Sequence, residues 1–156
     1  MSLEVLYKTN KLPQCDLFGI LTYEAELCGI VNNCPLRRRA VPFLHIDIFK
    51  DNDRQLRLYV RDPDLNVIDL TGATCVLSVK ETKSDASYAF QLSTAVPTEG
   101  MIGAADEGEA FFFITPTVTA ALAAPCQYIY DVTVTTSDGK VYTVVEGYLN
   151  LKLPVN

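Results

Sequence analysis

The fold is decided by residues 61–74, RDPDLNVIDLTGAT, which lie between two segments of alternating apolar and polar residues, QLRLYVRD and ATCVLSVKE. Alternation with a period of two is typical of a strand with one buried face. Within DPDLN, Pro63 fixes φ, and Asp and Asn side chains accept hydrogen bonds from nearby backbone amides, so this piece predicts a turn. The second piece, DLTG, needs a separate explanation.

We interpret DLTG as a corner at which the chain crosses from one sheet to another. Leu70 is then expected to fill the core, while Asp69 and Thr71 satisfy backbone groups that leave the strand ladder. Gly72 supplies a backbone conformation that other residues resist. This corner predicts two sheets that face each other.

Further strand-like segments follow at regular spacing, each rich in β-branched or aromatic residues: LHIDIFK, YAFQLSTAV, EAFFFITP, CQYIYDVTVTT and KVYTVVEGYLNLKL. TSDGK, residues 136–140, predicts a hairpin with a two-residue type I′ turn. TPTVTAALAAP, residues 115–125, predicts a helix of at most two or three turns that begins at Pro116. Residues 43–156 therefore predict an all-β fold, an antiparallel β-sandwich of about seven strands, which the resemblance described below marks as immunoglobulin-like.

Residues 1–42 keep no clean period, and we interpret them as an N-terminal arm or small subdomain. Their apolar content is too high for a free tail, so the sandwich or another chain must cover them. Within the arm, Phe18 and Leu21 are candidate contact residues. The basic cluster Arg37, Arg38 and Arg39 either contacts a phosphate or an acidic partner surface or forms a solvated linker.

The order of motifs resembles the immunoglobulin-like N-terminal domain of the baseplate upper protein family of tailed bacteriophages. The resemblance rests on the D-x-D-x-x-x-x-D-L-T-G-A-T turn, on EGEAFFFITPTVTAAL, on the Y-x-Y-D-V strand and on the D-G-K-x-x-T turn. It ends with VVEGYLNL, which carries Gly147, and covers roughly residues 45–153. The resemblance implies a sandwich domain in a virion structural protein.

Composition excludes several function classes. The net charge of −6 and the pI of about 4.7 argue against a general nucleic-acid binder, which needs a basic surface. No apolar run is long enough for a membrane span, and no signal peptide is visible. We therefore expect the chain to fold in a reducing cytosol, where disulfides are rare.

No pattern of catalytic residues emerges, and we expect neither enzymatic activity nor a cofactor. The single histidine, His45, lies two residues before Asp47 and is interpreted as a solvent-facing or interface residue; a general-base role is the alternative. A zinc site formed with the arm cysteines Cys15, Cys28 and Cys34 is the alternative to free thiols. Cys75 and Cys126 are interpreted as two core thiols rather than as an inter-sheet disulfide.

The surface offers a further set of candidates. Three consecutive phenylalanines occupy residues 111–113, and only alternate residues of a strand enter the core. If Phe112 faces inward, Phe111 and Phe113 face outward, where either the arm or a partner subunit covers them. Tyr148, on the last strand, poses the same question at a sheet edge open to a neighbouring strand.

These observations predict a structural component of a tailed-phage virion that is assembled in the host cytoplasm. It is an adaptor in the tail, baseplate or connector that contacts other virion proteins and its own copies through the arm and the sheet edges. Capsid decoration is the alternative within that class. A carbohydrate- or host-surface-binding module is the alternative of another class, since sandwiches with exposed tyrosines can bind sugars. Its aromatic residues would then cluster on loops or on one sheet face, away from subunit contacts.

Overall fold

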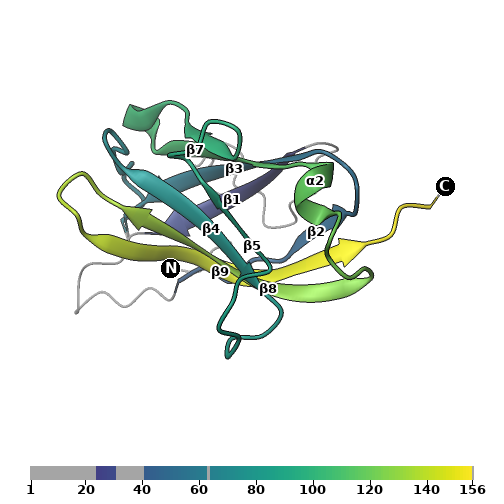
Figure 1. Ribbon diagram of the computed structural model, residues 1–156. Coiled ribbons are helices and arrows are strands. Elements are labelled where there is room, and N and C mark those ends of the chain that lie inside the picture. Colours follow the sequence, from purple (N-terminus) through teal and green to yellow (C-terminus); the bar gives the residue numbers. More distant parts are fainter. Residues whose placement is uncertain (1–23, 31–40, 63, 156) are drawn as a thin grey trace.

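The computed structural model describes residues 24–30, 41–62 and 64–155, which form two facing β-sheets (Figure 1). The four-stranded sheet has the order β1-β3-β7-β6, and the five-stranded sheet has the order β2-β9-β8-β4-β5. The strands of the first sheet are β1 (Glu24–Ile30), β3 (Arg54–Arg61), β7 (Glu109–Ile114) and β6 (Gly100–Ile102). Those of the second are β2 (Ile46–Phe49), β9 (Val141–Lys152), β8 (Cys126–Thr135), β4 (Thr74–Lys80) and β5 (Phe90–Ser93). The predicted all-β sandwich is confirmed.

Two strand pairings are parallel, which differs from the antiparallel arrangement that we predicted. β1 pairs with β3, and β2 pairs with β9, in the same direction, whereas the other pairings are antiparallel. Alternation reveals which residues face the core, but it carries no information on strand direction. Parallel neighbours need a long connection between them. Ile46 of β2 pairs with Leu149 of β9, so the chain between the two strands is long enough.

The corner at residues 61–74 is confirmed in detail. Asp62 accepts hydrogen bonds from the backbone N–H of Asp64 and of Asn66, each at 2.8 Å, and so closes the turn. In DLTG, the Asp69 carboxylate accepts bonds from the N–H and the hydroxyl of Thr71, and Leu70 is completely buried. The chain leaves β3 in one sheet and enters β4 in the other, with Gly72 at a φ of +71°.

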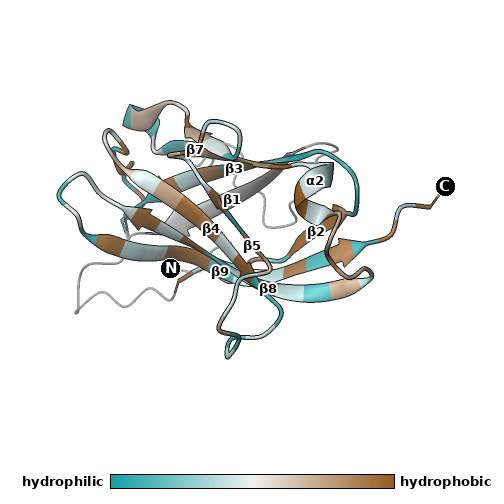
Figure 2. Ribbon diagram, in the orientation of Figure 1, coloured by the Kyte–Doolittle hydropathy of each residue, from teal (hydrophilic) through white to brown (hydrophobic). Residues whose placement is uncertain are grey.

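The core lies between the sheets and follows the alternation of the sequence. Along β8, buried and partly exposed residues alternate from Tyr128 onward, and the apolar bands on the strands alternate with polar ones (Figure 2). The largest fully buried side chains include Tyr128, Phe112, Leu70 and Leu149. Cys75 is also buried in this core, and Cys126 packs against it while partly exposed. Both thiols are free, so the expectation that they form no disulfide is confirmed.

Of two local predictions, the hairpin turn was wrong in detail and the short helix is confirmed. The hairpin between β8 and β9 has one residue at positive φ, Gly139 at +84°, whereas a type I′ turn needs two. Two backbone hydrogen bonds close a longer loop: Gly139 N–H donates to Thr136 O, and Thr136 N–H donates to Lys140 O. Within this loop the Thr136 hydroxyl donates to the Asp138 carboxylate. The predicted helix is confirmed: α2 begins at Pro116 and spans Pro116–Thr119, within the expected limit of two or three turns.

In the described structure, the segment before residue 43 contributes to the sandwich through β1 and through Pro42, whose carbonyl accepts a bond from Glu146 N–H of β9. β1, at Glu24–Ile30, lies within the predicted arm and pairs with β3. The boundary between an arm at 1–42 and a sandwich at 43–156 stays a prediction. Phe18, Leu21, Arg37, Arg38 and Arg39 lie outside the described residues.

Candidate functional site

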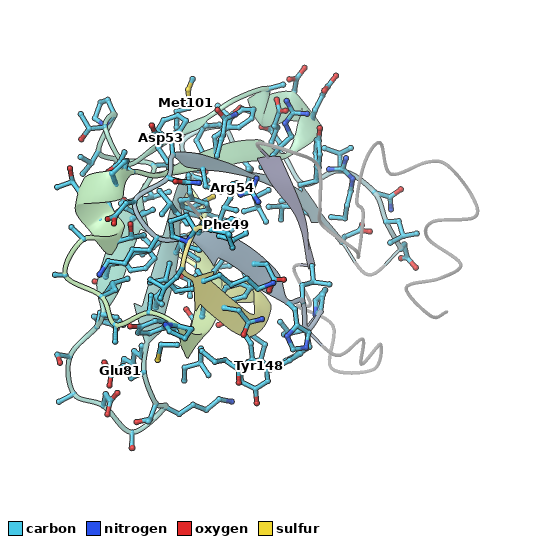
Figure 3. All side chains as sticks on the ribbon, turned by 90° about the vertical axis from the view of Figure 1, so that its right-hand side faces the viewer. Phe49, Asp53, Arg54, Glu81, Met101 and Tyr148 are labelled. Atoms are coloured by element: carbon cyan, nitrogen blue, oxygen red, sulfur yellow. The ribbon has the colours of Figure 1, made fainter. Side chains whose placement is uncertain are left out.

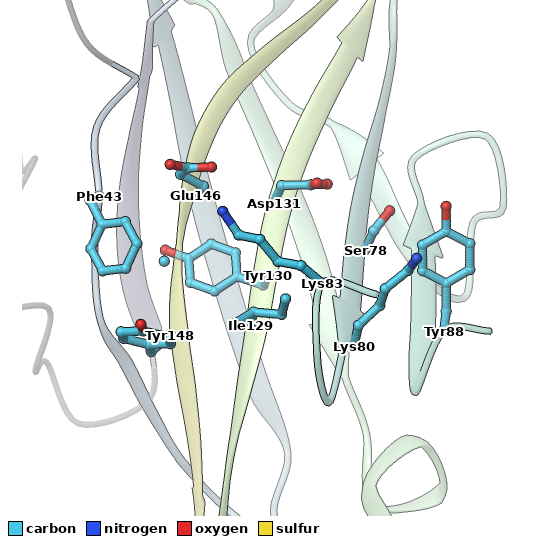
Figure 4. Close-up of a pocket in the computed structure, with 11 residues that line it drawn as sticks. Phe43, Ser78, Lys80, Lys83, Tyr88, Ile129, Tyr130, Asp131, Glu146 and Tyr148 are labelled. Atoms are coloured by element: carbon cyan, nitrogen blue, oxygen red, sulfur yellow. The ribbon is translucent and has the colours of Figure 1, made fainter. Parts of the chain in front are cut away.

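A groove of about 380 Å³ lies on the outer face of the five-stranded sheet (Figure 4). Its floor comes from β4, β8 and β9, whose outward residues alternate with the buried residues of the core. One wall is formed by the segment before β2 and the other by the loop between β4 and β5. The lining residues are Phe43, Ser78, Lys80, Lys83, Tyr88, Ile129, Tyr130, Asp131, Glu146, Gly147 and Tyr148.

Strand register brings these residues together from distant parts of the chain. Ser78 pairs with Asp131, Asp131 with Glu146, and Glu146 with Phe43, which forms one row across the sheet. The adjacent row runs from Lys80 through Ile129 to Tyr148. Side chains in such rows point to the same face, so they line one surface although Phe43 and Glu146, for example, are 103 positions apart.

Three rings form an aromatic cluster at the β9 side of the groove. The ring centroids of Phe43 and Tyr148 are 5.1 Å apart at an interplanar angle of 82°. His45 lies 5.7 Å from Phe43 and 5.3 Å from Tyr148. Edge-to-face contact is favourable between aromatic rings, so the cluster holds Phe43 against the sheet although 47% of its surface is exposed.

Two lysines stand at the opposite wall. The Lys80 ammonium donates a hydrogen bond of 2.6 Å to the carbonyl of Asp85 and lies 4.8 Å from the centre of the Tyr88 ring. Lys83 extends across the floor toward Glu146 (Figure 4). Tyr88 is 49% exposed, with the Lys80 ammonium over its ring.

Two carboxylates meet at the floor of the groove. Asp131 and Glu146 are direct cross-strand neighbours, and within the described part of the chain neither side chain takes part in a hydrogen bond or an ion pair. Burial, together with the charge of Glu146, raises the pKa of Asp131, while Lys80 and Lys83 act in the opposite direction. Asp131 is thus held in a partly desolvated place, and among the described residues its nearest charged groups are Glu146, Lys80 and Lys83.

The structure separates the sequence-predicted surface residues. Tyr148 lies in the groove, whereas Phe111 and Phe113 lie half-buried on the outer face of the other sheet. Phe112 is the one that enters the core, as the alternation required. Arg57 covers Phe111, with its guanidinium 5.2 Å from the ring centre and its Nε 3.3 Å from a Glu109 carboxylate oxygen. Figure 3 shows how far apart the two outer faces are, with Met101 of β6 and Tyr148 of β9 on opposite sides.

Tyr148 was predicted at a sheet edge, and this was wrong. β9 is an internal strand between β2 and β8, so the ring is presented on a sheet face. The error arose because β2, the actual edge strand, comes from the other end of the chain.

His45 is exposed, as predicted, but it is not oriented by Asp47. The Asp47 carboxylate instead bonds Lys152 at 2.6 Å and Asn150 at 2.8 Å, and these two contacts lower its pKa. Among the described residues, no group of three metal-binding side chains of the His, Cys, Asp or Glu type is present. The arm cysteines of the zinc alternative have no described side chains.

Most lining residues of the groove were missed at the level of sequence. Phe43, Lys80, Lys83, Tyr88, Asp131 and Glu146 were not singled out. Alternation does place Asp131 and Glu146 on outward positions of their strands. Only the register between β8 and β9, however, sets the two carboxylates side by side.

No protein-family model and no curated protein matches this sequence. Among solved structures, the fold is similar to the N-terminal domain of phage TP901-1 ORF48, with a TM-score of 0.49 and 6% sequence identity. That similarity covers 81% of this chain and 98% of the other. In the part of the chain that the structure describes, no helix has the length and apolar character needed to cross a bilayer.

Proposed function

We propose that this chain is a structural protein of a tailed-phage virion: an adaptor in the tail, baseplate or connector that associates with other virion proteins and with its own copies. The arm and the sheet edges make the contacts. The phage assignment comes from the sequence resemblance. Support comes from its motif residues, since the DLTG corner and Gly147 occupy positions on which the fold depends.

The open edge at β2 carries the proposal. Leu44 N–H bonds Glu146 O, and Glu146 N–H bonds Pro42 O, so the N–H and C=O of Phe43 itself point away from β9. Just after β2, Lys50 N–H bonds Lys152 O, so the N–H and C=O of Phe49 also point away from β9. Phe43 is 47% exposed and Phe49 is 41% exposed. Backbone groups that have no strand partner among the described residues, flanked by exposed aromatic rings, favour addition of a strand from another chain.

An experiment on self-association tests the edge. We expect Phe49→Lys to weaken self-association by at least about tenfold, because a charge on an edge strand opposes strand addition. Val141→Lys is the matched control, since Val141 is 64% exposed at the start of β9, away from the β2 edge. Light scattering over a concentration series measures both variants. A wild-type chain that stays monomeric, or equal effects of the two substitutions, would contradict assembly through this edge.

The arm needs its own test. Because Glu24–Ile30 is a strand of the sandwich, the deletion should remove residues 1–23 and spare β1. We expect weaker association in the same light-scattering assay with an unchanged circular dichroism spectrum. Unchanged association would remove the arm from the proposal.

One observation favours the function of the other class, a saccharide-binding module. Such a module was expected to gather its aromatic residues on one sheet face, and Phe43, Tyr148 and Tyr88 gather around one groove. Capsid decoration would use the same edge as the tail adaptor, and no feature of the groove favours it.

A further inference from the structure

The groove on the outer face of the five-stranded sheet has a use that the adaptor proposal does not assign. Its volume of about 380 Å³ lies within the range of small-molecule sites, about 300–1,000 Å³. It opens on a sheet face, so strand addition at β2 leaves its floor free. A ligand in the groove would contact β4, β8 and β9 at once.

The two carboxylates in the groove cost stability, and within the described structure neither is used in a hydrogen bond or an ion pair. Asp131 lies directly opposite Glu146, and like charges opposite each other destabilise a strand pair. Both carboxylates lack hydrogen-bond partners among the described residues, and Lys83 also makes no hydrogen bond or ion pair there. Groups kept unpartnered in a partly buried groove are typical of a binding site.

The lining is nevertheless electrically balanced, because two lysines accompany two carboxylates. A balanced groove does not select strongly for either an anion or a cation. It does present ammonium donors, carboxylate acceptors and the Ser78 hydroxyl within one small space. The ligand that satisfies all of them without a charge of its own carries several hydroxyl groups.

Aromatic rings complete the arrangement. Phe43 and Tyr148 lie at the β9 side of the groove, and Tyr88 lies at the opposite side, next to β5. β9 and β5 are three strand spacings apart, or about 14 Å. The rings at both ends of the groove can pack against apolar C–H faces of a ligand, while the polar groups between them bond its hydroxyls. Flat faces of C–H groups ringed by hydroxyls are characteristic of sugar rings.

We propose that this groove binds a neutral saccharide, with Tyr148 and Tyr88 as the packing surfaces and with Asp131, Glu146 and Lys83 as hydrogen-bonding groups. This site goes beyond the adaptor function and does not rest on it. Either one can fail while the other stands.

A glycan array probed with the full chain, followed by calorimetry on the glycans that bind, tests the proposal. We expect Tyr148→Ala and Tyr88→Ala each to weaken binding by about tenfold or more, because each removes an aromatic contact. Asp131→Asn should weaken it as well, while thermal melting shows that each variant is folded. Phe49→Ala is the matched control, since it removes an exposed ring that does not line the groove.

The outcomes are distinguishable. Binding that changes little between low and high salt and is lost in both tyrosine variants supports a neutral saccharide. If no neutral glycan binds at millimolar concentration, the proposal is overturned. It is equally overturned if a lysine-rich peptide binds instead, with salt-sensitive affinity that depends on Asp131 and Glu146. Equal losses in Phe49→Ala and Tyr148→Ala would also count against it.

Discussion

Gly147 shows how one residue can hold an edge of this fold in place. The backbone of Leu44 passes so close that a Cβ at position 147 would lie 1.7 Å from the Leu44 carbonyl oxygen. Tyr130, its cross-strand neighbour, donates a hydrogen bond of 2.8 Å to that same oxygen. The glycine therefore admits the segment before β2, and the tyrosine satisfies its buried carbonyl.

We expect Gly147→Ala to lower the free energy of unfolding by more than about 2 kcal/mol, because backbone must move to admit the methyl group. Gly139→Ala is the matched control. Its φ of +84° makes alanine strained, but open space surrounds the position, so a loss of about 1 kcal/mol is expected. Urea denaturation measures both variants. A smaller loss at Gly147 than at Gly139 would contradict the close approach.

At the scale of elements, the pairing of β8 with β9 creates the carboxylate pair at Asp131 and Glu146. Because burial raises the pKa of Asp131, the folded chain binds this proton more readily than the unfolded chain does. The contribution of Asp131 to the free energy of unfolding therefore falls as the pH rises from its pKa in the unfolded chain through its pKa in the folded chain.

We expect Asp131→Asn to stabilise the fold at about pH 7 by a few tenths of a kcal/mol, since much of the group is solvated. This gain should shrink as the pH falls through the raised pKa of Asp131, because the wild-type carboxyl then becomes protonated. Asp69→Asn should behave oppositely: bonds from Thr71 lower the pKa of Asp69, so the charged form stabilises the corner. Urea midpoints across the pH range measure both. A constant effect of Asp131→Asn at every pH would rule out this explanation.

Local elements were predictable from sequence, and non-local pairings were not. The Asp62 turn and the DLTG corner were predicted because their hydrogen bonds join residues at most four apart. The hairpin at 136–140 was misassigned because a hydrogen bond between the Asp138 and Thr136 side chains supports a different loop around the same Asp-Gly pair. The parallel pairing of β2 with β9 depends on register between segments about a hundred residues apart, and the groove depends on register between β4, β8 and β9. Alternation encodes neither.

At the scale of the whole molecule, Cys75 reports on the integrity of the sandwich. It is completely buried on β4, and burial raises the pKa of its thiol to about 12. Because the thiolate is the reactive form, alkylation requires the two sheets to separate. Cys126, at the start of β8, is only partly buried.

We expect iodoacetamide to modify Cys75 only over the urea range in which circular dichroism shows global unfolding. Cys126 should react at lower urea concentration, because local opening at the strand end exposes it. Mass spectrometry of peptides from the quenched reaction distinguishes the two sites. Equal rates at both cysteines in native buffer would show that the core opens without unfolding.

The parallel pairing of β2 with β9 also bears on how the chain acquires its structure. A polypeptide that emerges from the ribosome amino end first exposes β2 long before β9 has been synthesised. Until then Ile46 and Ile48, which end up buried, have no strand on which to dock. This edge is therefore the last part of the sheet to form during translation, and the nascent chain depends on the other pairings or on a chaperone to protect it.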